Sequence, residues 1–170
     1  MTTRSRRGTG ADRHDACHAL VALADALTRK HPKPSPRRFL CLLGTRAAGI
    51  RRGPLALFDL GNGGDDPVPG HGFRREFDDA TRGQVRHFVG TARAVTVFGV
   101  RVTRWLSIHV RDDAPDSADG RLGDAAIRFA TLLLDGDLAV EDAPSWLRAN
   151  LCIGNERNEV DERSLGGHPG

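Results

Sequence analysis

Hydrophobic residues recur at helical spacing along much of this chain, and the pattern is strongest in residues 81–99. On a helix, one apolar stripe of this segment holds Val85, Phe88, Val89, Ala92, Val95 and Gly99, and a second holds Gly83, His87, Gly90, Ala94 and Phe98. Between the stripes lie an edge of arginines and a thin polar edge of Gln84 and Thr91. A helix that is apolar on two faces needs packing partners on both sides. We therefore expect residues 81–99 to form a central helix, with His87 turned toward the interior.

Five other segments carry helical patterns or helix-start signals: residues 12–30, 37–50, 100–110, 120–135 and 142–151. Residues 100–110 also suit a strand, but no second strand is available to pair with, so we expect a helix. Its apolar pattern places Val102, Trp105 and Leu106 toward the core. Residues 53–80 are turn-rich and predict a solvated loop, within which residues 55–60 read as an extended piece. The predicted fold is all-α: a single irregular bundle of five to six helices around residues 81–99.

Polar residues that can cap a helix precede most of these segments: Asp12 or Asp15, Ser35 with Pro36 after it, Asp78, Asp79 or Thr81, and Ser117 or Asp119. Gly136 is placed to end the helix of residues 120–135. Gly83 and Gly90 each weaken the central helix by about 1 kcal/mol relative to alanine. We expect another backbone to approach the helix closely on the side of these two glycines.

The chain is long enough, at 170 residues, for one domain, which we assign to residues 12–153. Residues 1–11 form a small, basic and unpatterned arm, and residues 154–170 a polar tail; both are expected to be disordered. Residues 1–38 hold nine Lys and Arg against three Asp, which gives a net charge of +6. The remaining residues hold sixteen against nineteen acids, so nucleic-acid binding is unlikely beyond the basic N-terminal arm.

Three cysteines, Cys17, Cys41 and Cys152, form no CxxC pair and leave one thiol unpaired under any disulfide scheme. Each lies among apolar neighbours, where a free cysteine acts as a small buried hydrophobe. We expect all three to be reduced and the protein to be cytoplasmic. The apolar runs are too short for a membrane span, so no membrane partner is expected.

Two histidines, His87 and His109, fall at expected core-facing positions of consecutive helices. If these helices form a hairpin at Gly99, the two imidazoles can meet near the acidic segment 112–119. Two imidazoles and a carboxylate can hold a divalent metal, for which the candidate ligands are His87, His109 and Asp112. They can also act as a base and its orienting group. A histidine on an apolar helix face can equally be a core residue bonded to a carbonyl.

The order of these residues resembles the all-α domains at the C-termini of some Rhs-type polymorphic toxins. The resemblance covers residues 74–151 and rests on the pair Arg86-His87, on His109, and on Asp119 before the next helix. Members of that family carry a histidine-glutamate pair where this chain has His109-Val110. The resemblance implies a hydrolase-like effector whose candidate catalytic residues are Arg86, His87, His109 and Asp119.

Two functions follow from the sequence. The first is a helical module that acts through contacts with an unknown protein partner and has no assignable catalytic activity, because every common catalytic motif is incomplete. The alternative is a toxin-like or effector-like hydrolase, metal-assisted or histidine-based, that uses His87, His109 and an aspartate from residues 112–119. A divalent metal is the one cofactor that this second set suggests.

Overall fold

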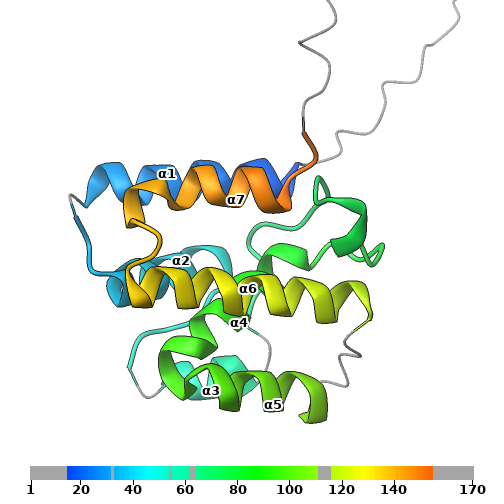
Figure 1. Ribbon diagram of the computed structural model, residues 1–170. Helices are drawn as coiled ribbons and strands as arrows, with labels where there is room; N and C mark the ends of the chain where they lie inside the picture. The colour runs from blue at the N-terminus through cyan, green and yellow to red at the C-terminus, as the bar shows by residue number, and fades with distance from the viewer. Residues whose placement is uncertain (1–14, 32, 54, 62–63, 111–115, 155–170) are drawn as a thin grey trace, which may run out of the picture.

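The computed structural model describes residues 15–31, 33–53, 55–61, 64–110 and 116–154 (Figure 1). Within these ranges the protein is all-α, as predicted, with seven α-helices, two short 3₁₀ helices and no strand. The α-helices are α1 (Ala16–Lys30), α2 (Pro36–Ala47), α3 (Leu55–Gly61), α4 (Gln84–Phe98), α5 (Val100–Val110), α6 (Ala118–Asp135) and α7 (Ala143–Leu151). The 3₁₀ helices are η1 (Arg75–Phe77) and η2 (Val140–Asp142).

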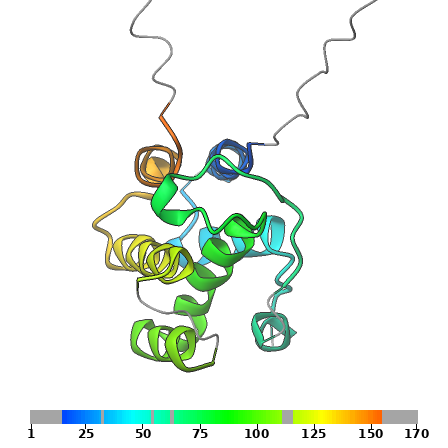
Figure 2. The same ribbon diagram turned by 90° about the vertical axis from the view of Figure 1, so that its right-hand side faces the viewer.

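The helices are stacked in three levels (Figures 1 and 2). Helices α1 and α7 lie side by side at one end of the bundle, and α2, α4 and α6 fill the middle. Helices α3 and α5 lie at the opposite end, with α5 against α4 and α6. Both α3 and α5 therefore have one side on the bundle and another side facing away from it.

Helix starts follow the sequence signals closely. The side chain of Asp15 accepts a hydrogen bond from the backbone N–H of His18 at the start of α1, and Ser35 and Ser117 cap α2 and α6 in the same way. Each cap satisfies a backbone donor that the first turn of a helix leaves unpaired. Helix α6 ends at Gly136, which adopts the left-handed conformation with a φ of 84°. These four boundaries confirm the predictions from the sequence.

Helix α4 is the central helix that the apolar pattern predicts. It packs against α2, α5 and α6, and most of its residues are buried. Phe88 of α4 is fully buried and its ring centroid lies 5.6 Å from that of Phe129 in α6, which in turn lies 5.0 Å from Trp146 in α7. This row of aromatic rings joins the middle level of the bundle to α7, at separations typical of favourable ring contacts.

The start of α4 differs from the prediction in two ways. Gly83 occupies the N-cap position without a side-chain cap, while Asp79 binds the side chains of Thr81 and Gln84 instead. The predicted close backbone approach is also wrong. A Cβ added at Gly90 would meet no described atom within 4 Å, and one at Gly83 would meet the guanidinium of Arg86. The two glycines are therefore not required by a neighbouring backbone.

Residues 70–74 connect the two ends of the described chain. The carbonyl of His71 accepts a hydrogen bond from Ala16 N–H, and the carbonyl of Gly72 accepts one from Ile153 N–H. Arg74 N–H donates to the carbonyl of Leu151. The middle of the sequence thus lies between the start of α1 and the end of α7 (Figure 1).

A disulfide joins Cys17 and Cys152 beside this segment, with a Cα–Cα distance of 5.5 Å. Both residues are fully buried, and Cys41 is the free cysteine. The expectation of three reduced cysteines is therefore wrong for two of them. Their 135-residue separation in sequence hid the pairing, because it depends on α1 and α7 lying side by side.

Two further expectations fail at the α3 and α5 end. Residues 55–61 form a helix rather than an extended piece, in which Ala56 and Leu60 are buried at helical spacing. Residues 100–110 are helical as expected, but Val102 and Trp105 are exposed instead of facing the core. The buried side of α5 carries Thr103, which lies against the bundle at 4% exposure.

Some predictions fall outside the part of the chain that the structure describes. These are the disordered basic arm of residues 1–11 and almost all of the polar tail of residues 154–170. Among the described residues, no helix is long and apolar enough to cross a bilayer.

Candidate functional site

His87 lies in the first turn of α4, where the chain turns in from η1 and the polar residues before the helix. Its side chain is half-buried, and its Nε2 atom is buried without a hydrogen-bond partner. A buried imidazole nitrogen normally has a partner, since leaving a polar atom unpaired costs about 1–3 kcal/mol. The ring is therefore turned inward as predicted, but the carbonyl bond of an ordinary core histidine is missing at Nε2.

Arg86 lies next to His87 on the exposed side of the same turn. Its guanidinium folds back over Gly83, where an added Cβ would lie 3.4 Å from Nη2. Arg86 and Arg82 also act electrostatically on Asp66, a residue of the turn-rich segment before α4. Two cations and one carboxylate thus gather at the start of α4.

Asp66 is partly buried, and its Oδ1 atom has no hydrogen-bond partner. Burial raises the pKa of the Asp66 carboxyl above its ordinary value, because removing water disfavours the charged form. Arg86 and Arg82 act in the opposite direction and lower that pKa, but burial has the larger effect. Sequence reasoning treated this residue as part of a solvated loop.

Gln84 is the most buried polar side chain near His87, at 2% exposure. Its Nε2 atom donates to Asp79 Oδ1 at 2.5 Å and to the carbonyl of Thr81 at 3.0 Å, while its Oε1 atom is buried without a partner. The sequence placed Gln84 on a thin polar edge of the helix. The signal that could have located it is the run of Asp78, Asp79 and Thr81 just before it, which supplies its acceptors.

The other predicted site residues are not brought together with His87 by anything the structure describes. His109 lies in the last turn of α5, but its side chain is outside the described part, and so is Asp112. Asp119 is half-buried in the first turn of α6, where Ser117 rather than Asp119 is the cap. The convergence of His87, His109 and an aspartate remains a prediction.

Metal binding finds no support among the described side chains, which contain no group of three or more His, Cys, Asp or Glu placed to hold an ion. The proposed ligand set of His87, His109 and Asp112 includes two side chains outside that part.

No family model, curated protein or solved structure matches the chain. The resemblance of residues 74–151 to Rhs-type toxin domains stays a prediction as well.

Exposed apolar side chains form the second notable feature, at the end of the bundle opposite α1 and α7. Of the seven large hydrophobic residues exposed in the described chain, six lie on α3, at the end of α4 or on α5: Leu55, Phe58, Val97, Val100, Val102 and Trp105. Phe58 is 71% exposed and Trp105 54%. The sequence analysis did not identify them, because an apolar pattern does not show which side of a helix its neighbours leave uncovered.

Proposed function

We propose that this protein is a non-catalytic helical module that acts through contacts with a protein partner. The observation that carries the proposal is the exposure of Phe58 on α3 and Trp105 on α5. Large exposed aromatic side chains are a recurrent property of protein-binding surfaces.

A photo-crosslinking experiment tests the proposal. Benzoyl-phenylalanine would replace Phe58 or Trp105 in the full chain, expressed in the organism that carries the gene. Ala22 is a matched control, since it is exposed on α1 at the far end of the bundle. We expect irradiation to give a discrete protein adduct from position 58 or 105 and none from position 22. Equal adducts from all three positions, or none from any, would contradict the proposal.

We also propose that the module works in an oxidising compartment. The cytoplasmic location expected from the sequence depended on three unpaired cysteines, and two of these are joined in the structure. Disulfides persist in oxidising compartments and are rare in the cytosol of most organisms. Alkylation of the protein in freshly lysed cells, before and after reduction, tests this proposal. One reactive thiol per chain before reduction supports it, and three reactive thiols before reduction contradict it.

A histidine-based hydrolase or effector is the second candidate function. It is favoured by one observation: the Nε2 atom of His87 is buried without a hydrogen-bond partner, so that nitrogen is not committed to a structural hydrogen bond. Growth inhibition on expression, together with metal content, would test it. Inhibition that His87→Ala relieves supports this function, whereas equal growth and no bound metal in both proteins argue against it.

A further inference from the structure

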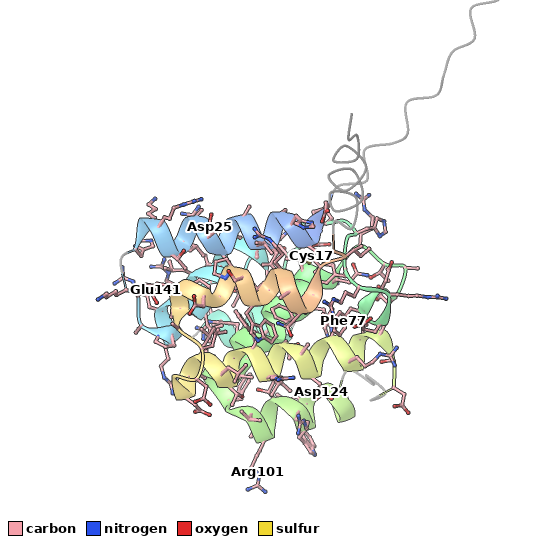
Figure 3. All side chains as sticks on the ribbon, turned by 45° about the horizontal axis from the view of Figure 1, so that its top comes forward. Cys17, Asp25, Phe77, Arg101, Asp124 and Glu141 are labelled. Carbon is pink, nitrogen blue, oxygen red and sulfur yellow. A yellow bond between two sulfur atoms is a disulfide. The ribbon has the colours of Figure 1, made fainter. Side chains whose placement is uncertain are left out.

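Five residues of helix α5 between positions 100 and 105 are exposed, and Arg104 is the one among them that is paired with α6. The other four, Val100, Arg101, Val102 and Trp105, are called the α5 face here. The opposite side of the helix carries Thr103, which is buried, and Leu106, which is half-buried. Arg101 projects away from the bundle (Figure 3). The α5 face is therefore a mixed surface of a large aromatic ring, two branched aliphatic side chains and a cation.

The α5 face is positively charged. Helix α5 has two arginines and no acidic residue. Arg104 forms an ion pair with Asp124 of α6, at 3.1 Å between Nη2 and Oδ1. Arg101 forms no ion pair with any described residue. A partner that covers the α5 face must therefore either supply a carboxylate or leave the Arg101 cation desolvated, which is unfavourable.

A second copy of the chain does not meet this requirement. A two-fold symmetric interface brings the same patch of both subunits together. Two α5 faces would bring two cationic patches together, and neither patch has a carboxylate of α5 to pair with Arg101. Charge complementarity thus favours a different partner.

The order of residues around helix α5 also does not suit binding to a membrane surface. Helices that lie on membranes need a continuous apolar face. At about 100° per residue, Arg101 and Arg104 fall between Val100 and Trp105 rather than beside them. Aromatic and arginine side chains mixed in this way are instead typical of the residues that contribute most to protein–protein binding.

We propose that the α5 face binds an acidic amphipathic helix of a partner protein, an inference that rests on the proposed function. Helix α5 has 11 residues and spans about 16 Å, so a partner helix of three turns can lie along it. The apolar stripe of the partner helix covers Val102 and Trp105, and a carboxylate one turn away on the partner helix pairs with Arg101. Arg offers a planar set of donors that suits a carboxylate.

Selection of peptides against the full chain tests this partner chemistry. A displayed library of helical peptides, with charge and apolar positions randomised, is selected on the wild-type protein. We expect the bound peptides to combine an apolar stripe with Asp or Glu. Their affinity should fall about tenfold in Arg101→Glu and recover when the acids of the peptide are changed to lysine. Arg148→Glu is the matched control, because it changes the net charge equally at an exposed position of α7.

The inference would be overturned by selected peptides without a preference for acidic residues, or by equal losses of peptide affinity in Arg101→Glu and Arg148→Glu. Self-association through the α5 face would also overturn it, and so would binding to phosphatidylserine vesicles that Arg101→Glu abolishes. Helix content measured by circular dichroism confirms that the variants are folded. The proposed function fails separately, if positions 58 and 105 give no specific adduct. A specific adduct with a partner that presents no carboxylate to Arg101 would overturn this inference alone.

Discussion

Removing the disulfide between Cys17 and Cys152 should destabilise the protein strongly. The bond closes a loop of 135 residues, and both sulfur-bearing side chains are buried where α1 and α7 lie together. The double variant Cys17→Ser/Cys152→Ser leaves every other residue in place. It removes the covalent link between the two ends of the domain, and reduced wild-type protein removes the same link without introducing hydroxyls.

The size of the effect follows from the length of that loop. In the chain-entropy model, the cross-link restricts the unfolded chain, and a loop of 135 residues corresponds to about 5 kcal/mol at 25 °C. Two buried hydroxyls add a further cost in the double variant, while residual structure in the unfolded chain reduces the gain from the cross-link. We expect a loss of about 2–5 kcal/mol in the free energy of unfolding.

Urea denaturation, followed by circular dichroism with and without reductant, measures this loss. With a slope of about 2 kcal/mol per M, the unfolding midpoint should fall by roughly 1–2.5 M in the double variant and in reduced wild-type protein. Reductant should leave the midpoint of the double variant unchanged, since Cys41 has no partner in the structure. A wild-type midpoint that does not respond to full reduction would refute the reasoning.

Three further predictions concern single side chains. Asp66→Asn should stabilise the protein at pH 7 and lose this advantage as pH falls below about 4. The reason is that the pKa of Asp66 is higher in the folded than in the unfolded protein, so stability decreases as pH rises between these two pKa values. Asp65→Asn, which changes the net charge equally, should have little effect in urea titrations at the two pH values. Gly64→Ala should lower the free energy of unfolding more than Gly53→Ala in the same assay. Both glycines have a positive φ, which costs about 1–2 kcal/mol for alanine, but a Cβ at Gly64 would also collide with a backbone carbonyl. Equal losses in the two variants would contradict this packing. Phe129→Ala should cost about 3–5 kcal/mol, because its ring is fully buried among aromatic neighbours; a loss below 1 kcal/mol would show that this core is not packed as described.

The helical architecture was predictable because local signals and the apolar pattern agree. Asp15, Ser35 and Ser117 each precede a helical pattern and each caps a helix, and Gly136 ends one. Helix α4 was identifiable as the central helix because it carries apolar residues on two faces. These features depend on residues close together in sequence, which is where pattern reasoning is strongest.

Two of the errors share one physical cause, because they concern contacts between residues that are distant in sequence. Cys17 and Cys152 pair because α1 and α7 lie side by side. Val102 and Trp105 are exposed because α5 lies at the edge of the bundle and turns Thr103 toward it. An apolar stripe at helical spacing indicates that a helix has a preferred face, but not which neighbours are present to cover it.

The candidate site was predictable only in part. His87 is on α4 and its Nε2 atom is inside the protein, as the second apolar stripe indicated. Its polar surroundings, Asp66 and Gln84, were missed, because one was assigned to a solvated loop and the other to a polar edge. Both are positioned by the turn-rich segment before α4, whose path has no periodic pattern to follow.

Hydrogen exchange of the full chain, with and without the partner captured by crosslinking, tests the central claim that this protein acts through the exposed end of its bundle. The account predicts slower exchange on binding in residues 55–61 and 100–110, and unchanged exchange in residues 16–30. Protection confined to the first turn of α4 around His87, with α3 and α5 unaffected, would contradict it.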